Sequence, residues 1–595
     1  MTRLLNRLLK PKPLLWSILL GAIGLRLAGI AFASSTPVGR PDEEIFAVEA
    51  LGMFVRPYGR LFTGWPDVAF KLWHAVVWIE RAWYHLRYGG GVNLACLVSL
   101  DPLAVILPVR VFLALLDVAT AVIVGRLAAE VAPARAEAAE LWAVALYAVN
   151  YLVGRNGHFA VSDPLVCFEV ALTLLCATRA ISRSPWWLVA AAFCAGTAVS
   201  TKYIALGLVF PCAVAAIDAL RRRAALPLVC AAVAAVIGLL LWSPEIVTHW
   251  SEFRLGFGTH LERYGGDQLF PGFGFYGLTI LPAAFGWPGM LLCLAGLVIC
   301  GRGRRGAPLV VYVCLVYACI LGPLSFTLAR YGAMLVPPLA AAGGIAADRL
   351  IERLSATPGR VRRPIAIVAV ALGALAIPAA RLVAFDRLLA RADTRDLARN
   401  WLVAQGADKV ILTEGVYAQV HAVAADVAAV CKRELPAALW RPVPILAAPV
   451  GPITAPTGEY RVTVNVRWMP VRLANEPVVT GRGESEWERI AFQGTERFVI
   501  WEHDQRIGLP ELHSPRAPDF LAQARGPREI GWLAGAGDPS APLDRCWVPA
   551  AHFSPGDLGG AKWEPHDAFF APLYGFRALE RPGPEISIYR NACKG

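Results

Sequence analysis

The chain is poor in charged residues, which make up 17% of its 595 positions, while hydrophobic residues make up 56%. With a mean hydropathy of +0.50, this composition excludes an ordinary soluble globular protein and predicts a polytopic membrane protein. No basic stripe with interleaved aromatic residues is present, so nucleic-acid binding is not expected although the formal net charge is +12. His-rich and Glu-rich ligand spacings are also missing, and we predict no obligatory metal and no other cofactor.

Long apolar runs dominate the chain up to Ala384, where a more polar region begins. Eleven of these runs are predicted to be membrane spans, and the third and the fifth are short for a bilayer crossing. Basic residues between Arg3 and Lys12 precede the first run, which predicts a cytoplasmic N-terminus, and arginines recur in alternate loops. An odd number of spans then places the C-terminal region on the outer side. The predicted spans are residues 14–33, 103–125, 141–153, 164–180, 186–199, 204–220, 225–242, 275–300, 308–324, 331–347 and 365–381.

Two domains are therefore expected. Residues 1–384 form the transmembrane domain, in which residues 35–101 are the first outer loop with juxtamembrane helices lying on the outer surface. Residues 385–595 form a soluble extracytoplasmic α/β domain, because strand-like apolar runs alternate there with helical patterns. A helix is expected at 393–405. Strands are expected at 409–413, 460–464, 498–501 and 586–589. No Gly-rich nucleotide loop occurs in this domain.

Cysteines are scarce in the C-terminal domain, where Cys431, Cys546 and Cys593 are the only ones. An oxidising compartment would allow one disulfide among these three, with a pairing that spacing does not decide. The other ten cysteines lie in or near the spans and are expected to act as small hydrophobic residues.

Three adjacent carboxylates follow the first apolar run, at Asp42, Glu43 and Glu44. By the span count they emerge at the outer membrane surface, where charges are expensive and usually functional. An acid pair at that level suits a general base that acts on a lipid-borne substrate. Asp42 and Glu43 are therefore the candidate catalytic residues. The alternative for Glu43 is an acid that stabilises a helix N-terminus, and Glu44 is expected to be a solvated cap residue.

Many of the remaining polar residues of the transmembrane domain fall on the same predicted face. Carboxylates and cations gathered at one membrane surface suggest an acid–base reaction on an anionic lipid headgroup. Aromatic residues are dense over 46–88, as is typical of helices in the membrane interface, although a soluble helical hairpin is the alternative. The polar residues on this face include Asp42, Glu43, His158, Asp163, Lys202, Glu245, Glu252, Arg254, Glu262, Arg263, Asp267 and Arg330.

Two charges lie inside the second span, at Arg110 and Asp117. Because they are seven positions apart, they share a helix face. We expect them to pair through a neighbour or to line the interior of the bundle, and we favour a structural role over a proton relay.

Several short motifs follow one another along the predicted outer face. They are Pro41-Asp42-Glu43, Gly64-Trp65-Pro66, His158 to Pro164, Ser200-Thr201-Lys202-Tyr203, Ala329-Arg330-Tyr331 with Pro337-Pro338, and Asp393-Thr394-Arg395. In this order, the motifs resemble those of the GT-C glycosyltransferases. The resemblance is to bacterial relatives of the protein O-mannosyltransferases and of the aminoarabinose lipid A transferases (ArnT), and it covers residues 14–395.

The resemblance implies a polyprenyl-phosphate monosaccharide donor, an acceptor hydroxyl and inversion at the sugar carbon. Asp42 would be the general base, with Glu43 holding it or binding sugar hydroxyls. The leaving phosphate needs cations aimed at it. The candidate phosphate-binding residues are Arg330, Lys202, Arg254 and Arg263, and the candidate sugar- or acceptor-binding residues are His158, Asp163, Tyr331 and Trp65. For Asp163, which precedes a proline, an ordinary helix N-cap is the alternative.

The implied location is the bacterial inner (plasma) membrane, with the N-terminus cytoplasmic and the C-terminal domain periplasmic. The implied partners are the lipid-linked donor, membrane lipids and an acceptor that is a glycan, a lipid or a protein. A lipid or solute transporter or flippase is the alternative, favoured by the charges inside the second span. Against it, the sequence has no repeat of hydropathy and no paired broken helices. A membrane-anchored binding protein is a third reading, for which eleven spans are more than an anchor needs.

Overall fold

The computed structural model forms two compact units. Unit 1 comprises Met1–Ala28, Phe62–Lys71 and Val111–Asp386, and unit 2 comprises Gly29–Leu61, Leu72–Arg110 and Arg387–Gly595. The residues that the structure describes are 11–34, 42–54, 66–90, 92–251, 253–254, 257–258, 271–325, 327–356, 363–406, 410–413, 423–446, 460–465, 547–557, 560–564 and 571–591.

Unit 1 is built from apolar helices, which satisfy their backbone hydrogen bonds internally as a bilayer requires. Its longer helices are α2 (Pro11–Leu27), α6 (Pro102–Val131, counted in unit 2 up to Arg110), α7 (Ala136–Ala148), α8 (Tyr151–Asn156), α9 (Asp163–Ser182), α10 (Trp187–Thr201), α11 (Val209–Arg221), α12 (Ala225–Trp242), α16 (Leu281–Gly301), α17 (Ala307–Val316), α18 (Val336–Ala356) and α19 (Arg363–Leu389). Its shorter helical pieces are η1 (Pro133–Arg135), η2 (Tyr203–Leu208), α13 (Glu245–Thr248), α15 (Pro271–Gly274), η3 (Phe275–Ile280), η4 (Arg304–Gly306), η5 (Tyr317–Leu321) and η6 (Ala329–Leu335).

In the described part of the chain, eight helical segments are long and apolar enough to cross a membrane. Each of the eleven predicted spans falls on a helix, but α2, α7 and α10 have only 17, 13 and 15 residues. At about 1.5 Å per residue, these three are shorter than a hydrocarbon core of roughly 30 Å. The structure thus confirms a multi-pass α-helical membrane protein, while the number eleven stays a prediction.

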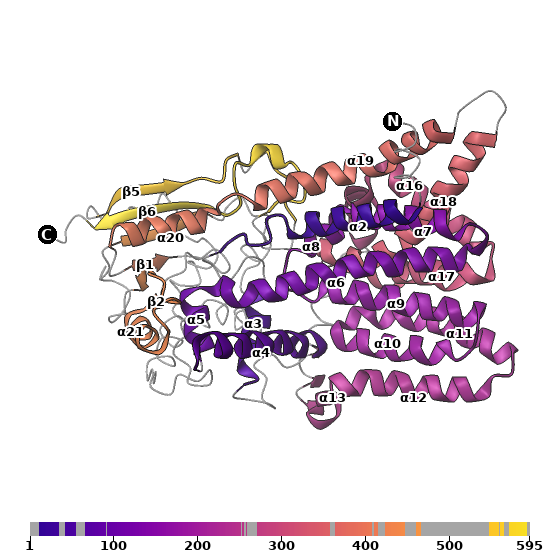
Figure 1. Ribbon diagram of the computed structural model, residues 1–595, viewed down its shortest axis with the longest axis horizontal. Helices are drawn as coiled ribbons and strands as arrows, with labels where there is room; N and C mark the ends of the chain where they lie inside the picture. Colours follow the sequence, from indigo (N-terminus) through magenta and orange to yellow (C-terminus); the bar gives the residue numbers. More distant parts are fainter. Residues whose placement is uncertain are drawn as a thin grey trace. The chain divides into compact units, whose positions relative to one another are not determined.

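Helix α10 lies beside α12 on one side and α9 on the other (Figure 1). The contact between α10 and α12 depends on Gly196 and Gly238. A Cβ atom on Gly196 would approach the Ala235 carbonyl oxygen, and one on Gly238 the Phe193 carbonyl oxygen, to less than 3.0 Å. Only glycine therefore fits at either position, as at many close helix crossings in membranes.

Unit 2 contains short helices from the first outer loop and from the C-terminal region. They are α3 (Glu43–Gly52), α4 (Val68–Tyr88, with its first four residues counted in unit 1), α5 (Leu94–Leu100), α20 (Thr394–Ala404), α21 (Ala425–Glu434) and the 3-10 turn η8 (Phe576–Ala578). Helix α20 confirms the helix predicted at 393–405. Asp393 is its N-cap, and its carboxylate accepts a hydrogen bond from the backbone N–H of Arg395.

Helix α4 has two apolar faces with different surroundings. Trp73 and Val77 are buried, whereas Trp78, Ile79 and Trp83 are exposed, each by more than half of its surface. Large apolar side chains on one face and scattered basic residues elsewhere are typical of a helix that lies in the membrane interface. This pattern favours the interfacial interpretation of residues 46–88 over a soluble hairpin.

Among its described residues, the C-terminal region carries a mixed six-stranded sheet of order β2-β3-β1-β4-β6-β5. Strands β2, β3, β1 and β4 pair in parallel, and β6 pairs antiparallel with both β4 and β5. The strands are β1 (Val410–Thr413), β2 (Val423–Ala424), β3 (Ile445–Leu446), β4 (Tyr460–Asn465), β5 (Trp547–Phe553) and β6 (Glu585–Asn591). Predicted strands at 409–413, 460–464 and 586–589 correspond to β1, β4 and β6, and the one at 498–501 lies outside the described residues. The predicted α/β character is confirmed.

A disulfide joins Cys96 of α5 to Cys431 of α21, across 335 positions of sequence. One half of the expectation was right, because Cys431 of the C-terminal domain is bonded. The other half was wrong, because its partner comes from the first outer loop and was expected to act as a small hydrophobic residue. Cys546 and Cys593 lie outside the described residues.

Candidate active site

Asp42 holds the N-cap position of α3 in an unusual backbone conformation, with φ 83° and ψ −19°. Residues other than glycine rarely adopt a positive φ, and such strained positions cluster at functional sites. The side chain does not cap the helix and is only 9% exposed. The predicted base is thus a largely buried acid held in a conformation that the surrounding structure must maintain.

Glu43 is the first residue of α3 and is completely buried. Its two oxygens accept hydrogen bonds from Nε and Nη2 of Arg110, at 2.9 and 2.8 Å. Arg110 also donates from Nη1 to the carbonyl oxygens of Ile30 and Phe32, at 2.9 and 3.0 Å. Bidentate pairs of this kind fix geometry as well as charge. Glu43 therefore ties the start of α3 to α6 and to the turn after α2.

Three of the predicted binding residues come together in unit 1. Nζ of Lys202, the C-cap residue directly after α10, donates to Oδ1 of Asp163 at 2.7 Å. The same ammonium lies 4.8 Å from the ring centroid of Tyr331, a cation–π distance. Asp163 is the first residue of α9, and Ser162 holds the N-cap position, so the N-cap alternative for Asp163 is wrong. One cation, one acid and one aromatic ring thus form a compact cluster.

The other predicted cations are Arg330, Arg254 and Arg263. Arg330 precedes Tyr331 in η6 and is partly buried, so it is next to this cluster in sequence. Arg254 is exposed. Arg263 and the predicted acceptor-binding Trp65 lie outside the described residues.

His158 is fully buried at the end of α8. Its Nδ1 lies 2.8 Å from the Gly154 carbonyl oxygen, and its Nε2 lies 3.0 Å from the Ala28 carbonyl oxygen. Nε2 is also 3.3 Å from Oδ1 of Asp386, and the ring packs edge-on against Phe385. Both ring nitrogens therefore face oxygen atoms of the protein.

The charges inside the second span have partners that we did not predict. Arg110 binds Glu43, whereas Asp117 accepts from Nε of Arg26 and from the Tyr147 hydroxyl, both at 2.7 Å. The expected pairing of Arg110 with Asp117 through a neighbour was wrong, because each is satisfied by a residue far away in sequence. Both side chains are 1% exposed, in line with the other expected alternative, a place in the protein interior. Arg26 is the single charge in the first span, and that isolation was the signal that could have identified it as the partner of Asp117.

Glu80 of α4 is a further buried acid that the sequence did not single out. It is 8% exposed, and neither of its oxygens has a hydrogen-bond partner among the described residues. Burial raises the pKa of Glu80 from the usual 4.5 to about 8. Burial, together with the nearby Glu80 charge, also raises the pKa of Tyr84 to about 12. Glu80 is therefore largely protonated at neutral pH.

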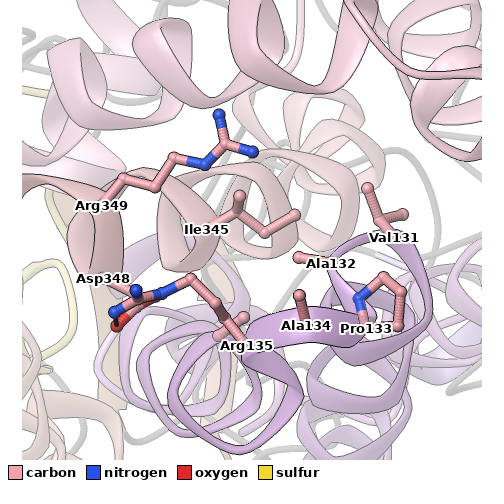
Figure 2. A pocket seen from close by; sticks show the side chains of 9 residues that line it. Val131, Ala132, Pro133, Ala134, Arg135, Ile345, Asp348 and Arg349 are labelled. Atoms are coloured by element: carbon pink, nitrogen blue, oxygen red, sulfur yellow. Dashed lines mark hydrogen bonds and ion pairs between the residues drawn. The ribbon is translucent and has the colours of Figure 1, made fainter.

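A cavity of about 210 Å³ lies where the end of α6 meets α18, and small apolar residues, Arg135, Asp348 and Arg349 line it (Figure 2). Nη2 of Arg135 donates to Oδ1 of Asp348 at 2.9 Å, and Nη1 of Arg135 pairs with Glu352 at 2.7 Å. Figure 2 shows Arg349 pointing away from the Arg135–Asp348 pair. None of the predicted site residues lines this cavity.

No protein-family model matches the chain, and no curated protein matches it either. Among solved structures, the oligosaccharyltransferase of Archaeoglobus fulgidus in the apo form is similar, with a TM-score of 0.42, 13% identity, and coverage of 67% of this chain and 62% of that one. A structure of the same enzyme with an inhibitory peptide and a dolichol-phosphate gives the same four values. ArnT from Cupriavidus metallidurans bound to undecaprenyl phosphate has a TM-score of 0.40 and 16% identity, over 66% of this chain and 72% of that one.

The chain thus spans less than two thirds of the length of the archaeal enzyme that it resembles. ArnT, the name of one of the two groups that the motifs resemble, is among these structures. Similarity at these TM-scores and identities carries no conclusion about the donor, the acceptor or the activity of this chain.

Proposed function

We propose that this protein is a membrane glycosyltransferase that moves a monosaccharide from a polyprenyl-phosphate donor to an acceptor hydroxyl, with Asp42 as general base. The observation that carries the proposal is the backbone of Asp42, a non-glycine residue at φ 83° directly before the anchored Glu43. Such strain persists only where the surroundings impose it, and it marks functional positions. The donor class and the motif roles come from the sequence resemblance.

The proposed reaction is an inverting displacement. The acceptor oxygen bonds to the anomeric carbon of the sugar while the bond from that carbon to the donor phosphate oxygen breaks. Asp42 takes the proton of the acceptor hydroxyl, and the polyprenyl phosphate leaves with the electron pair of the broken bond. A positioned base of this kind contributes on the order of 10²- to 10⁴-fold in rate.

The leaving phosphate gains charge and needs fixed cations. We assign this role to Lys202, which Asp163 and Tyr331 hold in place, and to Arg330 beside it in sequence. Arg254 and Arg263 remain weaker candidates for the same role. Trp65 remains a candidate for contact with sugar or acceptor, and the absence of an obligatory metal remains a prediction.

Glu43 and His158 receive different roles from those expected of ligand-binding residues. Both oxygens of Glu43 are engaged by Arg110, and both ring nitrogens of His158 face protein oxygens. We therefore assign both residues to positioning: Glu43 for the start of α3, and His158 for the packing of α8 near the end of α19.

We propose that the reaction takes place at the outer face of a bacterial inner membrane, with the C-terminal domain in the periplasm. The Cys96–Cys431 disulfide supports this orientation, because disulfides persist in oxidising compartments. The bond requires the first outer loop and the C-terminal domain to lie on the same side, as the span count predicts. The acceptor class, whether glycan, lipid or protein, stays open.

The test is sugar transfer from radiolabelled polyprenyl-phosphate sugars, with mannose, other hexoses and the pentose aminoarabinose in the panel, in membranes that carry wild type or Asp42→Asn. The substitution keeps the side-chain shape and removes the base. We expect wild type to transfer label and the variant to lose about 10²-fold or more. The matched control is Glu137→Gln, which removes an exposed acid on α7 and should transfer at the wild-type rate.

Equal transfer by wild type and Asp42→Asn would eliminate Asp42 as the base. Label that stays on every donor with wild type, across membranes that contain glycan, lipid and protein acceptors, would count against the transferase.

A lipid or solute transporter is the second candidate, because Arg26, Asp117 and Tyr147 form a buried polar group within the helices of unit 1. Both oxygens of Asp117 are engaged there, which favours a structural role over a transport pathway. Flux of a labelled polyprenyl phosphate across proteoliposomes distinguishes the two functions. Flux that Asp117→Asn abolishes and Asp42→Asn leaves unchanged would favour the transporter.

A further inference from the structure

The C-terminal region and the first outer loop are fastened to each other within unit 2 at three places. The covalent one is the Cys96–Cys431 disulfide between α5 and α21. Because its two cysteines belong to segments far apart in sequence, the bond restrains the loop against the C-terminal domain. Two polar attachments accompany it.

The first polar attachment joins Asp396 to Ser34. Oδ2 of Asp396, in the first turn of α20, accepts from the Ser34 backbone N–H at 3.0 Å and from its hydroxyl at 3.3 Å. Asp396 is only 7% exposed. A hydrogen bond to a buried carboxylate is among the stronger ones in proteins. The chain is therefore held at Ser34 by a residue of the C-terminal domain.

The second polar attachment involves Arg399, three positions further along α20. Its Nη2 donates to the carbonyl oxygens of Leu100 and Pro442, both at 3.2 Å. Its positive charge also faces Asp101: burial raises the pKa of Asp101, while the Ala104 amide and the charge of Arg399 oppose that rise. Helix α20 thus contacts the chain just before the outer loop, at Ser34, and near the end of that loop, at Leu100.

These attachments bear on Asp42 because the segment between Ile30 and Ser34 is held from two sides. Arg110 binds the carbonyl oxygens of Ile30 and Phe32 and, on the other side of Asp42, the carboxylate of Glu43. Asp396 binds Ser34. Residues 35–41 alone separate Ser34 from Asp42 in the sequence.

We propose that the C-terminal domain positions the segment that carries Asp42, and that Asp396 is a positioning residue for Asp42. This inference rests on the proposed function for its catalytic consequence, although its structural part does not. Asp396 fixes the chain before Asp42, Glu43 fixes it afterwards through Arg110, and the disulfide keeps α21 against the outer loop. The C-terminal domain is then part of the active-site framework.

The experiment measures amide hydrogen exchange and transfer kinetics on the full chain in detergent. Asp396→Ala removes the acceptor of Ser34, and we expect peptides that cover 29–34 and 42–54 to exchange roughly tenfold faster, the equivalent of one lost hydrogen bond to a charged group. Asp396→Asn keeps an acceptor oxygen and should restore much of the protection. Glu434→Gln, a matched change on the surface of α21, should exchange like wild type.

Transfer is measured with the radiolabelled polyprenyl-phosphate sugar that wild type consumes. Asp396→Ala should lower kcat about tenfold with little change in the KM for the donor, because it displaces the base and leaves donor contacts intact. The double substitution Cys96→Ser with Cys431→Ser should give a smaller change in the same direction, and Asp396→Asn should recover most of kcat.

Unchanged exchange at 29–34 and 42–54 in both Asp396→Ala and the double cysteine variant would overturn the positioning role. Faster exchange without a fall in kcat would limit the C-terminal domain to stability and overturn its link to catalysis. Faster exchange in a protein whose wild type transfers no sugar would leave the attachment standing and reject the proposed function instead.

Discussion

Two buried ion pairs, one in each unit, differ in how completely the cation is enclosed. The Arg110 side chain is 1% exposed, and its fork binds both oxygens of Glu43 and two backbone carbonyls. The Lys202 side chain is 18% exposed, and its ammonium binds Asp163 and lies over Tyr331. The planar fork of arginine suits a fixed structural contact, whereas lysine is a compact charge on a flexible stem.

The difference separates two uses of charge in one membrane protein. The guanidinium of Arg110 donates to protein groups and so fixes the backbone on both sides of Asp42. An ammonium that is partly exposed can also meet a substrate anion. We therefore expect substitutions in the first pair to act on stability and substitutions in the second pair to act on transfer.

The largest effect is expected from Arg110→Met. It leaves Glu43 buried without its cation, which should lower the free energy of unfolding by about 3–5 kcal/mol. Thermal unfolding in detergent measures this as a fall in Tm of several degrees. Glu137→Gln on the surface of α7 is the control and should unfold like wild type.

A double variant sharpens the interpretation. Glu43→Leu combined with Arg110→Met removes both charges and should recover part of the lost stability, because apolar residues often replace a buried pair at little cost. Recovery stays incomplete, since the Ile30 and Phe32 carbonyls lose their donor. A double variant that is less stable than Arg110→Met would contradict the view that the pair is structural.

Lys202→Gln should act on transfer instead. Loss of one cation at a developing charge lowers kcat on the order of 10²- to 10³-fold. Its Tm should change less than that of Arg110→Met, because the amide still donates to Asp163. Lys202→Arg keeps the charge and should retain more transfer than Lys202→Gln. If Lys202→Gln lost stability but kept wild-type kcat, the contrast between the two pairs would be broken.

The effect expected from Glu80→Gln depends on pH, from none at about pH 4 to one comparable with that of Arg110→Met at about pH 9. Between pH 4.5 and about 8 the folded protein keeps a proton on Glu80 that the unfolded chain has released. Stability therefore falls as the pH rises through this window. The total loss is about 1.4 kcal/mol for each unit by which the pKa values of the folded and unfolded states differ. The substitution removes this loss, so the variant should have a higher Tm than wild type at about pH 9 and an equal Tm at about pH 4. Equal Tm values at both pH values would show that Glu80 ionises freely in the folded protein.

Local patterns in the sequence predicted the elements well, because helix and strand formation depends on neighbouring residues. Every predicted span falls on a helix, and the strand-like run around Val410 is a strand. The positions of Lys202, Asp163 and Tyr331 on one predicted face also agreed with the cluster that they form.

Partners across the fold could not be predicted in the same way. The helical spacing between Arg110 and Asp117 was real, but which helix lies opposite each residue depends on tertiary packing, and both found other partners. Cys96 lies within the predicted outer loop at 35–101, on the same side as Cys431, but nothing in the sequence pairs these two cysteines. Its bond to Cys431 depends on how the outer loop meets a domain 335 positions away.

The glycine contact between α10 and α12 has a consequence for Lys202, which directly follows Thr201, the last residue of α10. Thr201 lies about 8 Å from Gly196 along the helix axis. Because Gly196 and Gly238 allow no added methyl group, the reach of the ammonium depends on side-chain volume at two uncharged positions. A larger residue at either glycine would push α10 and α12 apart and shift the end of the helix that precedes Lys202, so two uncharged positions outside the site help to set where the ammonium lies.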